Sequence, residues 1–341
     1  MTKRVGNLYD SVFTLDSLYE AYLRARRGKR KALAVMRFEQ DLGANLQQLC
    51  DELKDGSYQP SPYRHFVIRE PKVRQISAPA FRDVVVQHAI YHVINPLFDS
   101  TFVHYNYGCR VAKGTHRAAD AAQRFLRQSS PDSYTLQLDI RKFYYRIDRS
   151  ILREILSKKI KDERLLDLMM KFSEHGEPLG VPIGSLLSQL YALIYLNPMD
   201  HFIKRDLKIR RYVRYVDDFV LIGLSKKEAQ EAKEKIELFL ARELKLELSR
   251  WTIAPLKRGV NFVGFRTWRS RKFVRKHSLY RFSKSLAASD LPSLASIIGN
   301  ALRSSTFSHF CKRVFLERPD LVNQLPFSKW RVSNVYQHQH A

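Results

Sequence analysis

The chain has 341 residues, of which 45% are hydrophobic, a composition that is typical of a folded protein and excludes a disordered chain. Its 59 lysines and arginines exceed its 34 aspartates and glutamates, so the formal net charge is +25 at pH 7. A surplus of this size favours a polyanionic partner, most simply nucleic acid, while an anionic membrane surface or a ribosome-like structural role is also compatible with it. No apolar run reaches the ~20 residues that span a bilayer, so we expect no membrane association.

The cysteines and the N-terminus indicate the cellular compartment. Cys50, Cys109 and Cys311 are far apart and form no metal-binding pattern, so we expect free thiols. The first ten residues lack the apolar segment of a signal peptide. Both features predict a soluble, cytoplasmic protein.

The first hundred residues are predicted to be helix, hairpin and helix. Residues 1–59 repeat apolar side chains at intervals of three and four until Gly56 breaks the pattern. Residues 63–79 alternate and turn like a β-hairpin with its tip near Pro71. Residues 81–102 return to helical spacing.

The remaining residues mix strands and helices. Residues 133–140 alternate like a strand, and residues 184–205 form an apolar-striped helix. Residues 210–223 read as two short strands around a tight turn, and residues 225–248 as an amphipathic helix leading into a strand. The basic region after Arg266 is predicted to be mostly helical. The order indicates an α+β fold with helices packed on an antiparallel sheet.

Two adjacent acids, Asp217 and Asp218, interrupt the apolar run "YVRYVDDFVLIG". Burying two carboxylates side by side is costly, because each destabilises the ionised form of the other. A divalent cation would keep both ionised, and carboxylate oxygens are hard ligands that suit Mg²⁺. An ordinary exposed, Asp-rich turn would also explain the pair.

A third acid, Asp139, comes near the end of the strand "YTLQLDI". Together with Asp217, and with or without Asp218, it would supply oxygens to two metal ions ~3.5–4 Å apart, the arrangement that promotes in-line phosphoryl transfer. Alternatively Asp139 caps the following helix, although Asp148 stands closer to the helical run "RSILREIL".

Five ordered segments carry a family resemblance. "LDIRKFYYRID", "GVPIGSLLSQLYALIYLN" and "RYVRYVDDFVLIG" resemble motifs A, B and C of reverse transcriptases. "REPKVRQISAPAFRDVVVQHAI" resembles the fingers motifs of that family, and "LKRGVNFVGFRTW" resembles its primer-grip segment. The resemblance implies a right-hand polymerase with an antiparallel palm sheet. It divides the chain into a helical extension, fingers, palm (with part of the fingers) and a basic helical thumb with a C-terminal tail, at residues 1–59, 60–128, 129–265 and 266–341.

The segment "PIGSLLSQ" resembles the motif B signature of reverse transcriptases from diversity-generating retroelements of bacteria and phages. That resemblance implies a low-fidelity RNA-directed DNA polymerase that copies a template-repeat RNA into adenine-mutagenised cDNA. The implied partners are the template-repeat RNA, the primer and cDNA, deoxynucleoside triphosphates, and an accessory variability protein that is a small, basic, helical oligomeric barrel. Another bacterial reverse transcriptase, either defence-associated or group II intron-like, is an alternative, and a non-catalytic RNA-binding scaffold is a second.

The resemblance also implies roles for single residues. Asp139, Asp217 and Asp218 match the catalytic triad that binds two Mg²⁺ ions, with Mn²⁺ as a substitute, and the backbone carbonyl of Ile140 is a further metal ligand. Lys72 and Arg74 match fingers residues that hold the incoming triphosphate. Cations at a hairpin tip suit that task, although a solvated turn would carry them too.

Three residues near the predicted nucleotide site are implied to govern substrate choice. Tyr144, five residues after Asp139, matches an aromatic steric gate against a 2′-hydroxyl, or else packs in the core. Gln189 is implied to contact the nucleotide. Ile183 replaces the usual glutamine of motif B, and its purely apolar contact predicts looser base selection, unless it serves only in helix packing.

A basic stretch, residues 266–284, contains eight arginines and lysines and no acid, with interleaved aromatic residues. Such a composition suits phosphate contacts and stacking on a primer–template duplex, and a solvated helix face is the alternative. The predicted nucleic-acid contacts are Arg266, Arg269, Arg271, Lys272, Arg275 and Lys276.

Overall fold

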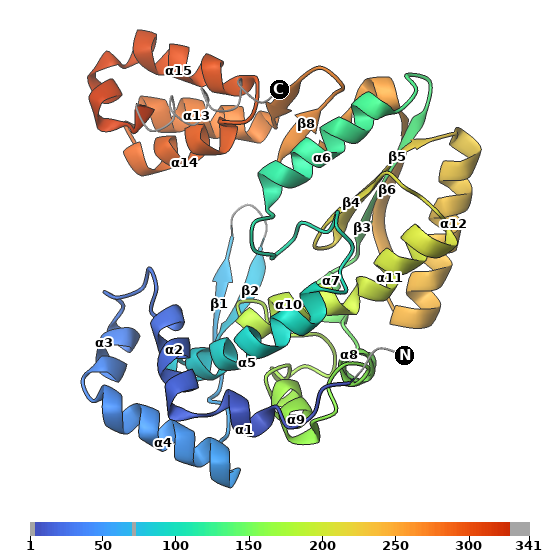
Figure 1. The fold of residues 1–341 in the computed structure, drawn as a ribbon. Coiled ribbons are helices and arrows are strands. Elements are labelled where there is room, and N and C mark those ends of the chain that lie inside the picture. Colours follow the sequence, from blue (N-terminus) through green and yellow to red (C-terminus); the bar gives the residue numbers. More distant parts are fainter. Residues whose placement is uncertain (1–3, 70–72, 328–341) are drawn as a thin grey trace. The chain divides into compact units, whose positions relative to one another are not determined.

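The computed structural model describes residues 4–69 and 73–327 (Figure 1). The chain divides into two compact units, each built from several stretches of sequence. The first unit consists of Met1–His104, Asp139–Ile209 and Glu234–Arg250. The second unit consists of Tyr105–Leu138, Arg210–Lys233 and Trp251–Ala341.

The first unit begins with the predicted helical region, which the structure confirms. Its helices are α1 (Tyr9–Val12), α2 (Leu15–Ala25), α3 (Leu33–Glu39) and α4 (Leu42–Asp55). Gly56 ends α4 in the left-handed conformation that glycine adopts readily, with φ of +83°. Helix α5 (Phe81–Asp99) packs against α2 and against α10 (Leu186–Tyr195), and its buried side chains form the centre of this unit.

The predicted hairpin of the first unit is also confirmed. Strands β1 (Arg64–Ile68) and β2 (Arg74–Ala78) pair antiparallel, with Ile68 opposite Arg74 at the described end nearest the tip. All five residues of β1 are exposed. The base of the hairpin is tied to the unit, because the Ser77 N–H donates to the Ile183 carbonyl at 2.7 Å.

Several helices complete the first unit. They are α7 (Phe143–Arg146), α8 (Arg149–Ser157), α9 (Glu163–Lys171), α11 (Asn197–His201) and the π-helical turn Phe202–Asp206. Asp148 caps α8, since its carboxylate accepts from the backbone N–H groups of Ser150 and Ile151. The capping role therefore falls to Asp148, while Asp139 lies within a strand. Helix α12 (Lys226–Leu244) begins in the second unit and ends in the first.

The second unit contains a four-stranded sheet of order β4-β5-β3-β6. Its strands are β3 (Tyr134–Ile140), β4 (Tyr212–Tyr215), β5 (Asp218–Leu224) and β6 (Leu248–Pro255). The residues at the end of β3 and the start of β6, residues 139–140 and 248–250, belong to the first unit. Helix α6 (Thr115–Gln128) packs its buried alanines against Val213, Val220 and Ile222 of the sheet. The predicted strand pair at residues 210–223 is thus confirmed.

A second sheet overlaps the start of the region, after Arg266, that the sequence predicted to be mostly helical. Strands β7 (Val260–Phe262), β8 (Phe265–Thr267) and β9 (Lys272–Val274) form an antiparallel three-stranded sheet. The helical prediction was therefore wrong for this stretch, because the burial of Phe265 and Thr267 on either side of the less buried Arg266 follows the two-residue period of a strand. It was correct from Lys276 onward, where α13 (Lys276–Ala287), α14 (Leu291–Ala301) and α15 (Thr306–Glu317) precede a short 3-10 turn (Pro319–Gln324).

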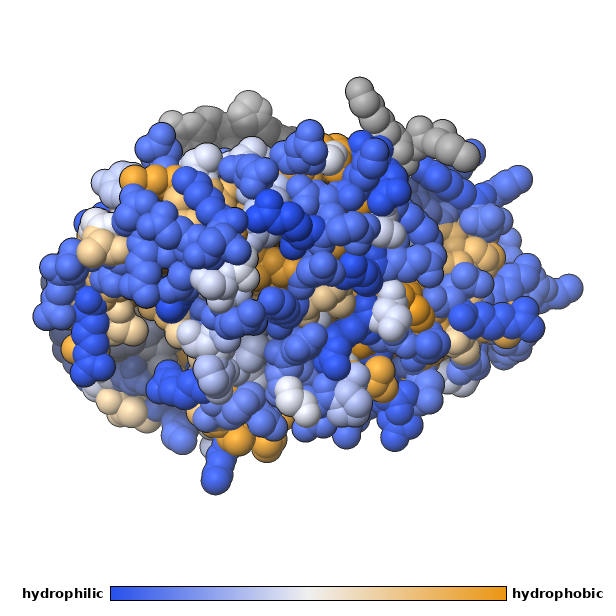
Figure 2. Space-filling model, turned by 90° about the horizontal axis from the view of Figure 1, so that it is seen from below, coloured by the Kyte–Doolittle hydropathy of each residue, from blue (hydrophilic) through white to orange (hydrophobic). Residues whose placement is uncertain are grey.

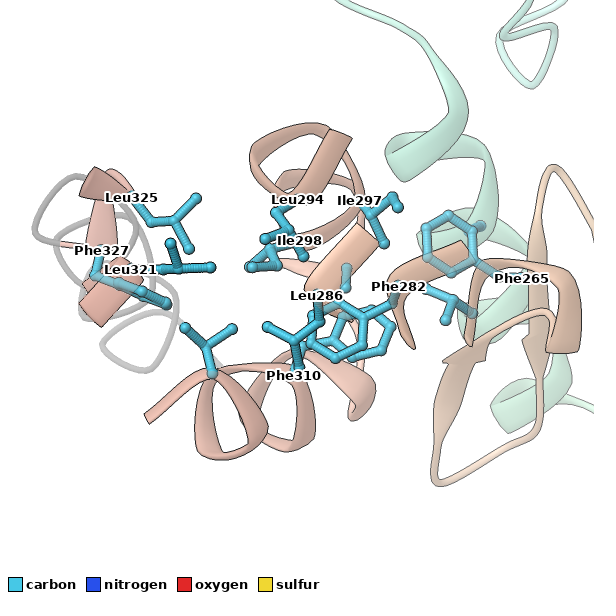
Figure 3. Close-up of a cluster of buried hydrophobic side chains, with 14 residues drawn as sticks. Phe265, Phe282, Leu286, Leu294, Ile297, Ile298, Phe310, Leu321, Leu325 and Phe327 are labelled. Carbon is cyan, nitrogen blue, oxygen red and sulfur yellow. The ribbon is translucent and has the colours of Figure 1, made fainter. Parts of the chain in front are cut away.

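The three C-terminal helices enclose a hydrophobic core of their own (Figure 3). The rings of Phe282 and Phe310 stack at its centre, with centroids 4.0 Å apart and planes 15° apart. Phe265 from β8 and Leu294 from α14 belong to the same cluster, so the core joins this sheet to the helices. Burial of these side chains supplies the main stabilisation of the region.

The surface agrees with the composition. Figure 2 shows a face on which hydrophilic residues predominate and hydrophobic residues are scattered. Within residues 4–69 and 73–327, no helix combines the length and the apolar character that crossing a membrane requires. Mixed helices and antiparallel sheets confirm the predicted α+β class.

Candidate active site

The paired aspartates lie at the turn between β4 and β5. Tyr215 pairs with Asp218, so Val216 and Asp217 form a two-residue turn. Val216 has a φ of +55°, which is unusual for a β-branched residue. The guanidinium Nη1 of Arg214, whose side chain is fully buried, donates to the Val216 carbonyl at 2.9 Å and braces the turn from within the sheet.

Asp218 has a polar neighbour that the sequence analysis missed. The side-chain amide of Gln137 on β3 donates to Asp218 Oδ1 at 3.2 Å and also to the Asn261 carbonyl. Because alternate residues of a strand share a face, Gln137 and Asp139 lie on the same face of β3. The two-residue spacing between Gln137 and Asp139 was the signal in the sequence that could have identified Gln137.

Asp139 belongs to the first unit and is half-buried. The hydroxyl of Ser249, on β6, lies 2.5 Å from Asp139 Oδ2 and donates to it. Ile140 beside it is buried, so its backbone is fixed within the strand. Ser249 is a second neighbour that sequence reasoning missed, and no local pattern marked a residue 110 positions away.

The chemistry of the acids suits a divalent cation. Asp217 and Asp218 are neighbours at one turn, and their carboxylate oxygens are hard ligands of the kind Mg²⁺ prefers. Within the part of the chain that the structure describes, no three His, Cys, Asp or Glu side chains are grouped so as to hold a metal ion. Asp139 belongs to the first unit, and the Asp217–Asp218 pair belongs to the second.

Ile183 lies in a tightly supported turn of the first unit. Its carbonyl accepts from Ser77 of β2, and Gly184 has a φ of +118°. A Cβ at position 184 would lie 2.8 Å from Ile76 Cγ2, so only glycine allows this approach to β2. The fully buried Gln87 accepts from Ser185 Oγ at 3.0 Å and from the Leu186 N–H at 3.1 Å, and so caps α10. Gln87 was not predicted.

A cavity of about 350 Å³ adjoins Ile183 within the first unit. Its walls include His65 and Gln75 from the β1–β2 hairpin, Tyr145 and His175. Burial lowers the pKa of His175, so its imidazole stays neutral at pH 7. The volume is in the range of small-ligand sites, and Ile183 gives the cavity an apolar wall.

The other predicted nucleotide contacts are distributed over the first unit. Tyr144 is half-buried and packs edge-to-face on the buried Phe143, with ring centroids 5.6 Å apart. Arg74 is exposed at the start of β2, and Gln189 is exposed on α10. Lys72 lies outside the described residues.

The predicted nucleic-acid contacts fall into three groups. Arg271, Arg275 and Lys276 are exposed. The Arg266 guanidinium lies over the Trp268 ring, 5.2 Å from its centroid, and Arg269 donates to the Arg127 carbonyl at 3.2 Å. Both side chains therefore make contacts within the protein.

Lys272 forms the third group. It is only 4% exposed, and its ammonium donates to Asp120 and lies 5.4 Å from the centroid of the Phe265 ring. Because its charge is neutralised inside the fold, we leave Lys272 out of the proposed contacts.

Comparison with known proteins agrees with the motifs. The family model for reverse transcriptase (RNA-dependent DNA polymerase) matches residues 68–267. The group II intron-encoded protein LtrA of Lactococcus lactis subsp. cremoris is 24% identical over 296 residues, which cover 64% of this chain and 49% of LtrA. Protein YkfC of Escherichia coli (strain K12) is 28% identical over 286 residues, which cover 70% of this chain and 74% of YkfC. The chain thus spans about half the length of LtrA.

A solved structure gives the same answer for the fold. Apo telomerase from Candida tropicalis matches with a TM-score of 0.51 at 13% sequence identity, covering 75% of this chain and 59% of that chain. The likeness is one of fold and confirms the predicted right-hand polymerase architecture. Because the reverse transcriptase model matches more than half of its residues, the chain belongs to the reverse transcriptase family.

Proposed function

We propose that the chain is an RNA-directed DNA polymerase that extends a primer on an RNA template with deoxynucleoside triphosphates. The observation that carries the proposal is the Asp217–Asp218 pair at a braced turn, within the matched reverse transcriptase segment. The net charge of +25 supports a nucleic-acid substrate.

The proposed metal ligands are Asp139, Asp217 and Asp218, with the carbonyl of Ile140. The segments that resemble motifs A and C, which carry these acids, both lie within the matched reverse transcriptase region, and this supports the set. Two Mg²⁺ ions, for which Mn²⁺ would substitute, would supply charge stabilisation for phosphoryl transfer when bound. Ser249 and Gln137 orient the carboxylates through hydrogen bonds.

The remaining contacts follow the right-hand division into an N-terminal extension, fingers, palm and thumb. Lys72 and Arg74 of the fingers hairpin hold the triphosphate, Gln189 contacts the nucleotide, and Tyr144 excludes a 2′-hydroxyl. In the thumb, the exposed Arg271, Arg275 and Lys276 contact the phosphates of the primer–template duplex.

Our finer proposal is a polymerase of the diversity-generating type. The segment "PIGSLLSQ" supports it, together with the position of Ile183 in a cavity wall, where it offers no hydrogen bond to a base. In this proposal the template is a template-repeat RNA, adenines are copied with low fidelity, and a small basic helical barrel protein assists.

A group II intron-like polymerase is the second candidate. The observation that favours it is the similarity to LtrA, which is itself described as a group II intron-encoded protein. Such an enzyme has no need of adenine-specific errors, so the error spectrum separates the two candidates.

Primer extension on an RNA template with Mg²⁺ and deoxynucleotides tests both levels of the proposal. We expect cDNA from the wild type and none from the Asp217→Asn/Asp218→Asn double variant. Sequencing of the cDNA should show errors concentrated at template adenines, and Ile183→Gln should reduce them about tenfold, the scale on which small contacts discriminate. An even, unchanged spectrum would favour the intron-like enzyme, and equal inactivity of wild type and variant under every template and metal tried would favour a scaffold.

A further inference from the structure

A loop of the first unit, residues 177–181, is fastened to the segment that carries Tyr144. The Val181 N–H donates to the Tyr144 carbonyl at 2.9 Å, and the Gly180 N–H donates to the Ile147 carbonyl at 2.9 Å. The acceptors are the second residue of the single-turn helix α7 (Phe143–Arg146) and the residue that follows the helix. The position of the Tyr144 backbone therefore depends on the position of the loop.

Helix α7 needs such support. It has only four residues, and a single helical turn is unstable in isolation because nucleation is costly. It is preceded by Lys142, whose φ of +46° lies in the left-handed region. Phe143 is buried, while Tyr144 is half-buried.

Arg149, the first residue of α8, holds the loop. Its Nη1 donates to the carbonyls of Glu177 at 3.0 Å and Gly180 at 3.3 Å. Its Nη2 donates to the carbonyls of Glu177 at 3.0 Å and Pro178 at 2.9 Å. A planar guanidinium can reach several acceptors at once, whereas the single ammonium of a lysine cannot reproduce this fork.

The backbone that carries Arg149 is itself held in place by the preceding residue. The neighbouring Asp148 caps α8 and accepts from Lys245 Nζ at 2.7 Å. The side-chain hydrogen bond from Lys245, aided by the cap bonds, outweighs the opposing effect of burial and lowers the pKa of Asp148, so this anchor stays ionised at neutral pH.

Gly180 allows the loop to approach α7 closely. Its φ is +87°, and a Cβ there would lie 2.8 Å from both the Tyr144 carbonyl oxygen and Tyr145 Cα. Both atoms belong to the backbone, so they cannot turn aside as a side chain would. Gly176, in the same loop region, has a similar φ of +90°, but a Cβ added there would meet no atom within 4 Å, which makes it a matched comparison.

We propose that Arg149 and Gly180 are positioning residues for Tyr144, and that together they set how strongly the enzyme discriminates between deoxynucleotides and ribonucleotides. The inference rests on the proposed function, in which Tyr144 excludes the 2′-hydroxyl. A steric gate discriminates only if its ring is held within a fraction of an ångström, and the loop supplies that restraint through the backbone.

The glycine pair gives the first test. The kcat/KM for a deoxynucleotide and for the matching ribonucleotide is measured in primer extension for wild type, Gly180→Ala and Gly176→Ala. We expect the ratio to fall about tenfold in Gly180→Ala, because the loop and α7 must separate. Gly176→Ala introduces the same backbone strain without the collision, so its ratio should stay at the wild-type value.

The arginine series gives the second test and does not depend on Gly180→Ala folding. Arg149→Gln should lower the same ratio several-fold, and Arg149→Lys should restore only part of it. The control is Arg153→Gln, one turn further along α8, where the arginine pairs with Glu163 and Asp167 at 2.8 Å each and does not touch the loop. Its ratio should be unchanged.

The outcomes separate this inference from the proposed function. A wild type that makes no cDNA overturns the proposed function and this inference with it. An active wild type whose ratio is the same in Gly180→Ala, Arg149→Gln and Arg149→Lys overturns the positioning role alone. Equal falls in the test variants and in their controls would show a general loss of stability, and would also overturn it.

Discussion

The two hairpins that carry the proposed chemistry are built in opposite ways. In β1–β2, every residue of β1 is exposed, and the described tie to the first unit is at the base of the hairpin, through Ser77 and Ile183. In β4–β5, residues 212–214 and 219–222 are buried, Val213, Val220 and Ile222 pack against α6, and Arg214 braces the turn. Each hairpin nevertheless ends in charged residues with a predicted role.

The difference agrees with the role that we propose for each set of charges. Metal-bound carboxylates require geometry held to about half an ångström, which a buried hairpin provides. Cations that grip a flexible triphosphate act over a longer range and tolerate an exposed, adaptable strand. The buried hairpin should therefore be sensitive to small changes, and the exposed hairpin should be tolerant of them.

The largest expected effect is at the buried tip. Asp217→Asn removes a charge that we propose to bind metal, without changing size, and should lower kcat by at least about 10³-fold, or ~4 kcal/mol of transition-state stabilisation. Asp218→Asn should also lower kcat, because Asp218 is a second proposed metal ligand at the same turn. Steady-state primer extension measures both, with the exposed Asp132→Asn as control. A loss of less than tenfold in Asp217→Asn would contradict the assignment.

The hairpin comparison itself is tested by stability. Phe219 on β5 is fully buried and Phe66 on β1 is 41% exposed. Phe219→Ala should lower the free energy of unfolding by about 3–5 kcal/mol, whereas Phe66→Ala should lower it by less than about 1 kcal/mol. Urea denaturation of the two variants measures the difference. Equal losses would show that the two hairpins are supported alike.

The sequence predicted the buried hairpin well because its signals are local. Short apolar runs on both sides of the Asp217–Asp218 pair define the strands and the turn within twelve residues. The same holds for Asp148, whose capping role follows from the adjacent helical run.

Residues whose roles depend on distant partners were predicted poorly. Lys272 sits in a run of basic residues and reads as surface, but Asp120, 152 positions earlier, holds it inside. The strands β8 and β9 have three residues each, too few for a period to emerge beside the helices that follow. Nothing in the sequence indicated the role of Arg149, because its hydrogen-bond acceptors are backbone carbonyls 28 to 31 positions away.

At the exposed hairpin we expect a milder effect on activity. Arg74→Gln should raise the KM for deoxynucleotides about tenfold, or ~1.4 kcal/mol, with a smaller change in kcat, because it removes the charge contact that we propose to the substrate before and during reaction. Arg64→Gln, at the other end of the same hairpin, is the matched control and should leave KM unchanged. A fall in kcat at constant KM would instead show that Arg74 contacts the substrate only in the transition state.

The smallest effect concerns α5, the helix that directly follows the exposed hairpin. Burial, followed by repulsion from Lys29 and Arg24, lowers the pKa of His88 to about 4, below its ordinary value of ~6.5. In this pH range the unfolded chain therefore binds a proton at His88 and the folded chain does not. The free energy of unfolding consequently decreases as the pH falls from 6.5 towards 4. His88 is partly exposed, so between pH 7 and pH 5 this loss should be about 1 kcal/mol after solvent screening. His88→Gln should remove this loss of stability between pH 7 and pH 5. His92→Gln, at an exposed position on the same helix, is the control and should not remove it. Urea denaturation at both pH values measures the effect. Parallel profiles of the free energy of unfolding against pH for wild type and His88→Gln would show that the acid sensitivity of the first unit arises elsewhere. In that case α5 does not set the pH range over which the exposed hairpin keeps its support.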